Sequence, residues 1–284
     1  MASNPQSVIP NRALDQLVRR VDEDRWLASR FAPHAVRARL VALYAVNHEI
    51  ARTGELVSDP GVGAVRLAWW RDAVSQALDG ASSPREHPAI AGFAAAARGA
   101  PWRAESFAAL FEARAADLQS APFGSIEQME VYVGATAGAV MRLAVEACDV
   151  ACDGAVEDFV RAGALAWGLT GLMRAEPHWR ARGRTMLAGQ DCPHSEIIAR
   201  ARSAHAEARQ LALKQRTLNS PRFDGGRRAN LRSDVLGLPS TAFPAIGYVA
   251  LAPGYLRALE RGDGRPPLLA RQIRLIGAAA TGRL

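Results

Sequence analysis

Helical spacing of apolar residues constrains the fold of this chain more than any other sequence feature. Leu40, Leu43 and Tyr44 lie on one helical face, and alanine recurs in runs such as FAAAARGA at 93–100. The alternation of apolar and polar residues that marks strands, usually with β-branched side chains, is hard to find in the sequence. We therefore predict an all-α protein of about ten helices.

The length and composition favour one large domain. The chain has 284 residues, of which 49% are apolar, so it can bury a sizeable core. It has no internal repeat and no linker long enough to divide it. We expect residues 1–284 to form a single domain in which 219–234 is a loose polar loop.

Capping signals and prolines place the expected helix ends. Ser58 or Asp59 can cap a helix with Pro60 at its first position, and Ser125 begins the capping box SIEQ. Pro177 is expected to end a helix that starts at Asp153 or Gly154. The expected helices cover 12–29, 33–55, 60–78, 88–98, 103–119, 125–148, 154–176, 193–218, 241–261 and 266–279.

Two glycines mark a close approach within the helix expected at 125–148. Gly134 and Gly138 are four residues apart, so they share a helix face without side chains. A neighbouring helix or a ligand could pack against that face, and we favour the helix.

The C-terminal third is strongly basic. Residues 1–179 carry 17 basic and 21 acidic side chains, whereas 180–284 carry 18 and 7. This asymmetry suits a polyanion such as anionic lipid or diphosphate, and a solvated arginine surface explains it equally well. Because the basic segment lacks interleaved aromatic residues, we expect no nucleic-acid partner and rank a membrane surface higher.

Targeting and membrane signals are weak. The first 20 residues contain no apolar h-region, and three cysteines cannot complete a disulfide framework, which predicts a reducing compartment. An uncharged run at 235–256 is long enough to cross a bilayer, but three prolines interrupt it, so we expect a core helix. The predicted location is the cytoplasm, with the periphery of the inner membrane as the alternative.

Five segments keep a family-specific order along the chain. They are WLASRFAPHAVRARLVALYAV at 26–46, RLAWWRDAV at 66–74, YVGATAGAVMRL at 132–143, GLTGLMR at 168–174 and PAIGYVALAPGYLRAL at 244–259. Together they resemble the squalene and phytoene synthase family over nearly the whole chain. The resemblance implies an isoprenoid synthase-type helical bundle around a central pocket.

The resemblance also implies where catalytic motifs should lie. Members of that family bind Mg²⁺ on two aspartate-rich motifs, and the metal holds two allylic diphosphates for head-to-head condensation. The corresponding positions here are Ala51, Arg52, Thr53, Gly54 and Glu55 for the first motif, and Ala175, Glu176, Pro177, His178 and Trp179 for the second. A guanidinium cannot ligate Mg²⁺, so we expect both metal sites to be lost. We predict no metal or cofactor unless the chain is an enzyme, in which case Mg²⁺ is expected.

Two interpretations remain open for the charged residues at these positions. Glu55, Glu176 and His178 could converge on a replacement metal site, which would suit a transition metal better than diphosphate-bound Mg²⁺. Alternatively, Glu49, Arg52 and Glu55 form a ladder of i,i+3 ion pairs on one helix. We favour the ladder.

Short signatures point to one branch of the family. Asn47 and Glu49 match AFNxEIA, Arg66 and Trp70 match R...FW, and Arg174 begins a match to R.TPYH that includes His178. These are similar to a divergent branch that includes a mitochondrial respiratory complex I assembly factor. The resemblance implies a binding surface made of Tyr44, Asn47, Glu49, Arg66, Trp70 and Arg174.

We derive three hypotheses of function. The first is a non-catalytic helical protein that binds a protein partner, such as a respiratory complex subunit, or a lipid at a membrane surface, and assists complex assembly. The second is an active prenyltransferase that makes squalene, phytoene or a hopanoid precursor. It would bind diphosphate through arginines, for which the candidates are Arg52, Arg174, Arg182 and Arg184.

The third hypothesis is ligand binding without turnover. A pocket between helices could hold a prenyl chain or a quinone tail, or larger side chains could have filled it. The candidate lining residues are Tyr44, Trp69, Met141, Leu172 and Met173.

Overall fold

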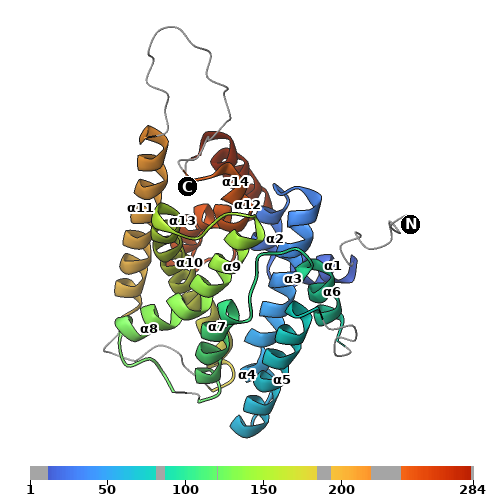
Figure 1. Cartoon of the computed structure of the whole chain (residues 1–284). Coiled ribbons are helices and arrows are strands. Elements are labelled where there is room, and N and C mark those ends of the chain that lie inside the picture. The colour runs from blue at the N-terminus through green and yellow to red at the C-terminus, as the bar shows by residue number, and fades with distance from the viewer. Residues whose placement is uncertain (1–11, 81–86, 120, 184–192, 219–237, 283–284) are drawn as a thin grey trace, which may run out of the picture.

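The computed structural model describes residues 12–80, 87–119, 121–183, 193–218 and 238–282. All regular elements in these ranges are helices, and no strand occurs among them, which confirms the predicted fold class (Figure 1). The α-helices are α1 (Arg12–Val21), α2 (Glu23–Ser29), α3 (His34–Ala51), α4 (Thr53–Leu56), α5 (Pro60–Leu78), α6 (Pro88–Ala97), α7 (Glu105–Ala116), α8 (Ile126–Val133), α9 (Ala139–Ala147), α10 (Gly154–Arg180), α11 (His194–Leu218), α12 (Phe243–Ile246), α13 (Ala252–Arg261) and α14 (Leu268–Thr281).

α3 is the central helix of the bundle. Every residue from 40 to 47 is buried, which means that this stretch has no solvent-facing side. Such a helix must be surrounded by others, and α1, α2, α6, α7 and α9 all pack against it. Figure 1 shows α5 and α6 on one side of the molecule and α10 with α11 on the other. The packing of this stretch therefore fixes the position of the polar residues that follow it in α3.

Two helices expected to be continuous are broken by a single residue each. The helix expected at 12–29 breaks at Asp22, which has φ −144° and ψ 60° and whose side chain caps α2 by accepting the Arg25 N–H. The helix expected at 33–55 breaks at Arg52, where α3 ends and α4 begins. Asp22 breaks the helix because a short acidic side chain competes for backbone N–H groups.

The turn after α3 fits closely against α7. A Cβ atom at Gly54 would lie 3.2 Å from the carbonyl oxygen of Asp117. Glycine thus lets α4 approach the C-terminal end of α7. The helix start at Pro60 is as predicted, with Asp59 accepting the Val62 N–H at 3.0 Å.

The helix expected at 125–148 contains a π-helical turn, Gly134–Gly138, between α8 and α9. Ser125 caps it through the Gln128 N–H, as the capping box predicts. The two glycines do not share a packed face: a Cβ on Gly134 would meet nothing within 4 Å, whereas one on Gly138 would lie 3.7 Å from Ala164. The expected close approach therefore holds only at Gly138, which faces Ala164 on α10.

α10 continues beyond the residue expected to end it. Pro177 lies inside the helix, which ends at Arg180, and the Pro177 carbonyl accepts the Ala181 N–H at 3.1 Å. The prediction that Pro177 ends the helix is wrong. A proline one turn from the end removes one hydrogen bond but does not prevent the last residues from remaining helical.

The uncharged segment before α13 is buried, as predicted, but it is not one helix. Its described part alternates two 3₁₀ turns, Ser240–Ala242 and Gly247–Leu251, with the short α12. Every residue from 242 to 252 is buried. In the described residues no helix is long and apolar enough to cross a membrane. The loop predicted at 219–234 lies outside the described residues.

His205 on α11 is expected to make stability depend on pH. The imidazole is buried and its Nε2 atom has no hydrogen-bond partner among the described residues. Burial, followed by the charges of Arg274 and Arg209, lowers the pKa of His205 from 6.5 to about 4. Between these values the unfolded chain binds a proton that the folded chain does not, so the free energy of unfolding decreases as the pH falls. Above pH 7 the group contributes nothing.

We expect this histidine to remove on the order of 2 kcal/mol of stability between pH 7 and pH 5. Urea unfolding of the wild type and of the His205→Gln variant at both pH values measures it. The His205→Gln variant should lose much of the difference in stability between the two pH values. The His194→Gln variant, at an exposed position of the same helix, should keep that difference. An unchanged pH dependence in His205→Gln would contradict the assignment.

Candidate functional site

The polar end of α3 holds a buried carboxylate between two arginines. Glu49 is 7% exposed, and its Oε1 atom lies 3.4 Å from Nη1 of Arg52. Its Oε2 atom lies 3.9 Å from Nη2 of Arg66 on α5. The predicted ladder thus exists between Glu49 and Arg52. Its second step, from Arg52 to Glu55, is absent among the described contacts because Glu55 turns towards another helix.

The two regions that the resemblance assigns to the motifs meet at Glu55 and His178. The Oε2 atom of Glu55 on α4 lies 3.8 Å from Nε2 of His178 on α10. The Nη1 atom of Arg182 donates a hydrogen bond to Nδ1 of His178 at 3.0 Å, and the His178 ring stands edge-on to Trp179. Both partners of the ion pair are partly exposed. This contact is therefore a surface pair that joins the ends of two helices.

Glu176 does not join that pair. It is buried, and its Oε1 atom accepts a hydrogen bond from Nε of Arg180 at 2.6 Å. In the described part of the chain, no group of three His, Cys, Asp or Glu side chains is placed to hold a metal ion. Ala51 and Ala175 are partly exposed and have no side-chain donor. The interpretation as a converging site of Glu55, Glu176 and His178 has no support in this geometry.

A small polar cavity of about 180 Å³ lies between α2, α3, α7, α8 and α10. Two arginines line it, and both are paired: Arg25 with Asp22 at 2.9 Å and Arg114 with Asp117 at 3.0 Å. The Arg25 guanidinium also lies over the rings of the buried Tyr44 and Tyr248. The cavity is therefore lined by strong donors whose charges are already compensated.

The hydroxyl group of Tyr132 completes the second pair. It accepts a hydrogen bond from Nη1 of Arg114 at 2.7 Å and donates one to Asp117 at 2.7 Å. Burial raises the pKa of Tyr132 well above its ordinary value, so the phenol keeps its proton. Asn47 also lines the cavity, and its Oδ1 atom is buried without a hydrogen-bond partner among the described residues. Water or a small polar molecule suits these atoms better than an apolar chain.

The five residues proposed to line one apolar pocket belong to two different clusters. Tyr44 and Met141 are fully buried in the main core, against which Trp69 also packs. Leu172 and Met173 belong to a second cluster with α8 and α11. Of the five, Leu172 alone lines the cavity described above. Among the described residues, these five side chains are therefore divided between two clusters and do not gather around the cavity described above.

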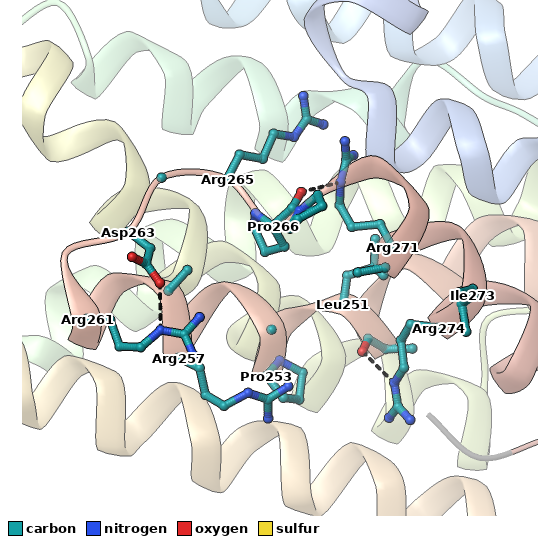
Figure 2. Close-up of a pocket in the computed structure, with 16 residues that line it drawn as sticks. Leu251, Pro253, Arg257, Arg261, Asp263, Arg265, Pro266, Arg271, Ile273 and Arg274 are labelled. Atoms are coloured by element: carbon teal, nitrogen blue, oxygen red, sulfur yellow. Dashed lines mark hydrogen bonds and ion pairs between the residues drawn. The ribbon is translucent and has the colours of Figure 1, made fainter.

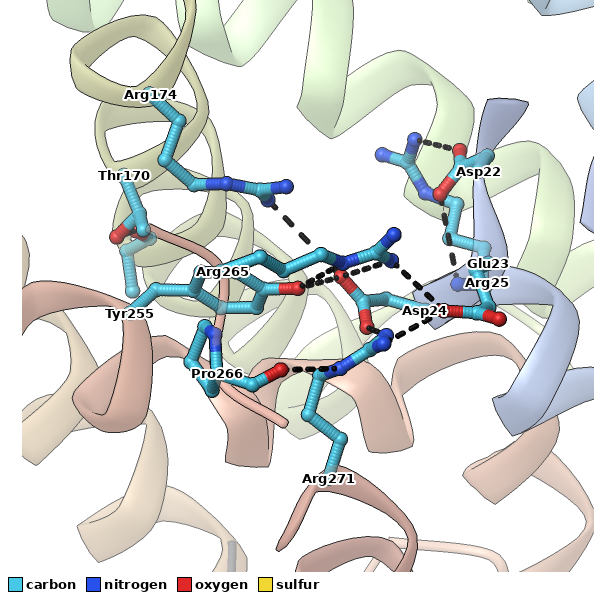
Figure 3. A network of polar contacts seen from close by, with 11 residues as sticks. Asp22, Glu23, Asp24, Arg25, Thr170, Arg174, Tyr255, Arg265, Pro266 and Arg271 are labelled. Carbon is cyan, nitrogen blue, oxygen red and sulfur yellow. Dashed lines mark hydrogen bonds and ion pairs between the residues drawn. The ribbon is translucent and has the colours of Figure 1, made fainter. Parts of the chain in front are cut away.

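Arg174 belongs to a buried polar network that ties the N-terminal helices to the C-terminal ones (Figure 3). Its guanidinium carbon lies 3.9 Å from the ring centre of Tyr255, and Nη1 lies 4.0 Å from Oδ2 of Asp24. Asp24 also binds Nη1 of Arg271 at 2.6 Å and accepts the Tyr255 hydroxyl at 2.6 Å. Arg265 donates to the same hydroxyl at 3.0 Å. The network fixes the position of Arg174.

Trp70 lies in the core, where a binding partner cannot reach it. It is 1% exposed, and its ring contacts Trp69 and His87 edge-on. The predicted binding residues therefore divide between core and surface. Arg66 and Arg174 keep partly exposed side chains, whereas Tyr44, Asn47, Glu49 and Trp70 are buried.

Comparison with known proteins identifies the family. The sequence profile of squalene/phytoene synthase matches residues 18–275. The chain belongs to the squalene/phytoene synthase family. The relatives include NADH dehydrogenase (ubiquinone) complex I, assembly factor 6, of the rat, which is 24% identical over 259 residues, covering 87% of this chain and 73% of the relative. The human protein of the same name is 22% identical over the same shares.

Two solved structures show the same fold. Squalene synthase HpnC from Alicyclobacillus acidocaldarius superposes with a TM-score of 0.63 at 18% identity, covering 92% of this chain and 99% of that one. A dehydrosqualene synthase in complex with ligand gives 0.65 at 11% identity, covering 98% and 97%. At such identities the comparison supports the squalene/phytoene synthase fold and nothing finer.

The residues at the two motif regions do not fit a Mg²⁺ site. Mg²⁺ requires several oxygen ligands at near-octahedral geometry. Each carboxylate in this region already has a side-chain partner: Glu49 lies beside Arg52, Glu55 beside His178 and Glu176 beside Arg180. A metal ion would have to displace these partners and approach the Arg52 guanidinium. We derive no metal-dependent step from this geometry.

The family resemblance did not predict Asp24, Arg25, Arg114 or Arg271. Asp24 and Arg271 pair across 247 residues, so no local spacing marks them, whereas Arg25 and Arg114 pair with carboxylates three residues away. The segment DEDRW at 22–26 was one available signal, because three carboxylates at the junction of two helices need cations nearby. It was hidden inside a helix expected to be continuous.

Proposed function

We propose that this squalene/phytoene synthase-family protein is non-catalytic and assists the assembly of a respiratory complex by binding protein partners. The observation that carries the proposal is the pairing of carboxylates with side chains of the same chain where α3, α4, α5 and α10 meet. There, His178 and three arginines engage the carboxylates at distances between 2.6 and 3.9 Å. Loss of the aspartate-rich motifs, as read from the sequence, explains why these carboxylates are free to pair.

The central cavity supports the same proposal. Its volume of about 180 Å³ is below the roughly 300–1,000 Å³ that is typical of small-molecule sites. Its two arginines are paired with carboxylates of their own chain, so a diphosphate would have to compete with Asp22 and Asp117. Condensation of two prenyl chains needs more space than this cavity offers.

The partner and location follow from the relatives and from the charge distribution. The mammalian relatives are named as assembly factors of complex I, and we propose subunits of a respiratory complex as the protein partners. A prenyl lipid or a membrane surface is a further expected contact, with the protein in the cytoplasm or peripheral on the inner membrane. We also propose one domain over 1–284 and no bound cofactor.

Measurement of diphosphate release tests the absence of catalysis. The purified protein is incubated with farnesyl and geranylgeranyl diphosphate, with Mg²⁺ and with chelator. We expect no release in either condition while the helical circular dichroism signal shows that the protein is folded. Metal-dependent release would establish the alternative, an active prenyltransferase that condenses allylic diphosphates, and would overturn the proposal.

Deletion of the gene in the source organism tests the assembly role directly. We expect less assembled respiratory complex on native gels, and restoration by the wild-type chain. The Glu55→Gln variant should restore assembly equally well, because the proposal gives its carboxylate no metal to hold. Normal assembly after deletion would refute the assembly role. Failure of a folded Glu55→Gln variant would instead indicate that this carboxylate has a chemical role.

A further inference from the structure

The outward face of α14 is apolar and uncovered. Leu269, Ile273 and Ile276 are 66%, 61% and 59% exposed. Their spacing of four and three residues places them on one stripe of the helix. The opposite face, with Arg271, Leu275 and Ala278, is buried against the rest of the protein. An exposed stripe of large aliphatic residues is unfavourable in water unless it meets a partner.

A basic groove of about 800 Å³ borders this stripe, between α13 and α14 (Figure 2). Ile273 belongs both to the stripe and to the groove. Five arginines and one carboxylate line the groove: Arg257, Arg261, Arg265, Arg271, Arg274 and Asp263. The apolar stripe and the basic groove therefore form one continuous surface, which we call the α13–α14 face.

Four of the five groove arginines form two groups, and the fifth, Arg261, pairs with Asp263 at 2.6 Å. Arg265 and Arg271 point towards the partly buried Glu23 and the buried Asp24 and bind them. Arg257 and Arg274 point the opposite way in Figure 2, towards α11. Neither forms an ion pair with a carboxylate of the described chain, and within the same residues the one hydrogen bond of the Arg274 side chain goes to the Ala250 carbonyl at 3.1 Å.

The unpaired arginines repel one another. Burial lowers the pKa of Arg274, and the positive charges of Arg209 on α11 and of Arg257 lower it further. Arg209 likewise has no carboxylate partner among the described residues. Arg209 and Arg257 therefore lie close enough to Arg274 to repel it, and none of the three has a carboxylate partner among the described residues. An anion placed among them would relieve this repulsion.

We propose that the α13–α14 face docks on an anionic lipid bilayer. Leu269, Ile273 and Ile276 enter the interface between headgroups and acyl chains, and Arg257 and Arg274 bind lipid phosphates. A helix with aliphatic residues on one side and arginines beside them is suited to lie in the plane of a membrane surface. This inference rests on the proposed function, since it assigns the membrane contact proposed there to one surface of the protein.

A lipid surface fits this face better than a protein partner. The exposed large side chains of the stripe are all leucine or isoleucine, and no aromatic residue lines the groove. Protein interfaces are enriched in tyrosine, tryptophan and phenylalanine at their centres. The excess positive charge of residues 180–284, with 18 basic and 7 acidic side chains, matches the negative potential of an anionic leaflet.

Vesicle co-sedimentation of the purified full chain tests the proposal. One set of vesicles contains phosphatidylcholine alone, and the other also contains phosphatidylglycerol, both at physiological ionic strength. We expect binding to the anionic vesicles only, and weaker binding as salt is added. Binding to both sets alike, or to neither, would overturn the proposal.

Matched variants locate the contact. Ile273→Glu should weaken binding roughly tenfold or more, because a charge replaces a side chain that leaves water. Val131→Glu on α8, where the native residue is 74% exposed, should bind like the wild type. The double variant Arg257→Gln/Arg274→Gln should bind about 25-fold more weakly, from about fivefold for each arginine. Arg98→Gln/Arg103→Gln, at exposed positions elsewhere, should bind within about twofold of the wild type.

Equal losses in the α13–α14 variants and in the controls would show that net charge or folding explains the result, and would refute the assigned surface. If the face variants bind vesicles normally but no longer retain a respiratory subunit, the face is a protein interface and the lipid assignment is wrong. Vesicle binding uses the protein alone, so its failure leaves the deletion test of the assembly role intact.

Discussion

Replacement of Asp24 by asparagine is expected to lower the free energy of unfolding by about 3–5 kcal/mol. Asp24 is 2% exposed and Arg271 is 5% exposed, and their charged atoms lie 2.6 Å apart. The substitution leaves the Arg271 guanidinium buried with only Glu23 to compensate it. It also weakens the hydrogen bond from Tyr255 and the attraction of Arg265. Urea unfolding followed by circular dichroism measures the loss.

An exposed pair serves as the control for this variant. Asp158 and Arg161 lie 3.1 Å apart with side chains 48% and 64% exposed, so Asp158→Asn should cost at most about 1 kcal/mol. A double-mutant cycle of Asp24→Asn with Arg271→Gln should give a coupling energy of about 0.5–3 kcal/mol. If Asp24→Asn costs no more than Asp158→Asn, the buried network does not stabilise the junction of α2 and α14.

Replacement of Gly168 by alanine is expected to destabilise the protein by about 1–3 kcal/mol. A Cβ atom at this position on α10 would lie 2.3 Å from Cγ1 of Val133, which is 1% exposed and β-branched. Such a side chain has few alternative rotamers, so the helices α8 and α10 would have to separate. Urea unfolding measures this free-energy change. Gly168 also lines the central cavity, so the substitution changes the cavity wall as well.

Gly171 supplies a matched control one helical turn away. A Cβ atom there would meet nothing within 4 Å. Gly171→Ala should therefore stabilise α10 by about 0.5–1 kcal/mol, since alanine has the higher helix propensity. The two variants differ from the wild type by the same methyl group, and opposite signs are expected. The same sign for both would show that crowding against Val133 does not decide the outcome.

The helices themselves were largely predictable from local signals. Asp59 with Pro60, Ser125 with Gln128, and the apolar run around Leu43 each predicted an element that the structure contains. The errors concern helix ends: Asp22 and Arg52 interrupt helices expected to be continuous, whereas Pro177 lies inside a helix that it was expected to end. At Asp22 and Arg52 a single residue interrupts the helix. A pattern of apolar residues that extends over several turns does not reveal one such residue.

The candidate site was only partly predictable. The family resemblance placed Glu55 and His178 in motifs that should face each other, and the structure brings them to 3.8 Å. It did not predict that Glu176 turns to Arg180 or that Arg66 reaches Glu49. Those pairings depend on side-chain direction at a helix end, which sequence spacing does not specify.

By itself, the sequence determined that the chain is helical, where most helices begin, and which family it belongs to. Each of these depends on residues within a few positions of one another or on their order. Tertiary structure alone decided that Asp24 meets Arg271, 247 residues further along the chain. It also decided that Ile273 is exposed while Leu275 is buried. The physical reason is that local periodicity reports on one turn or two, whereas buried charge pairs and uncovered faces depend on how the whole chain packs.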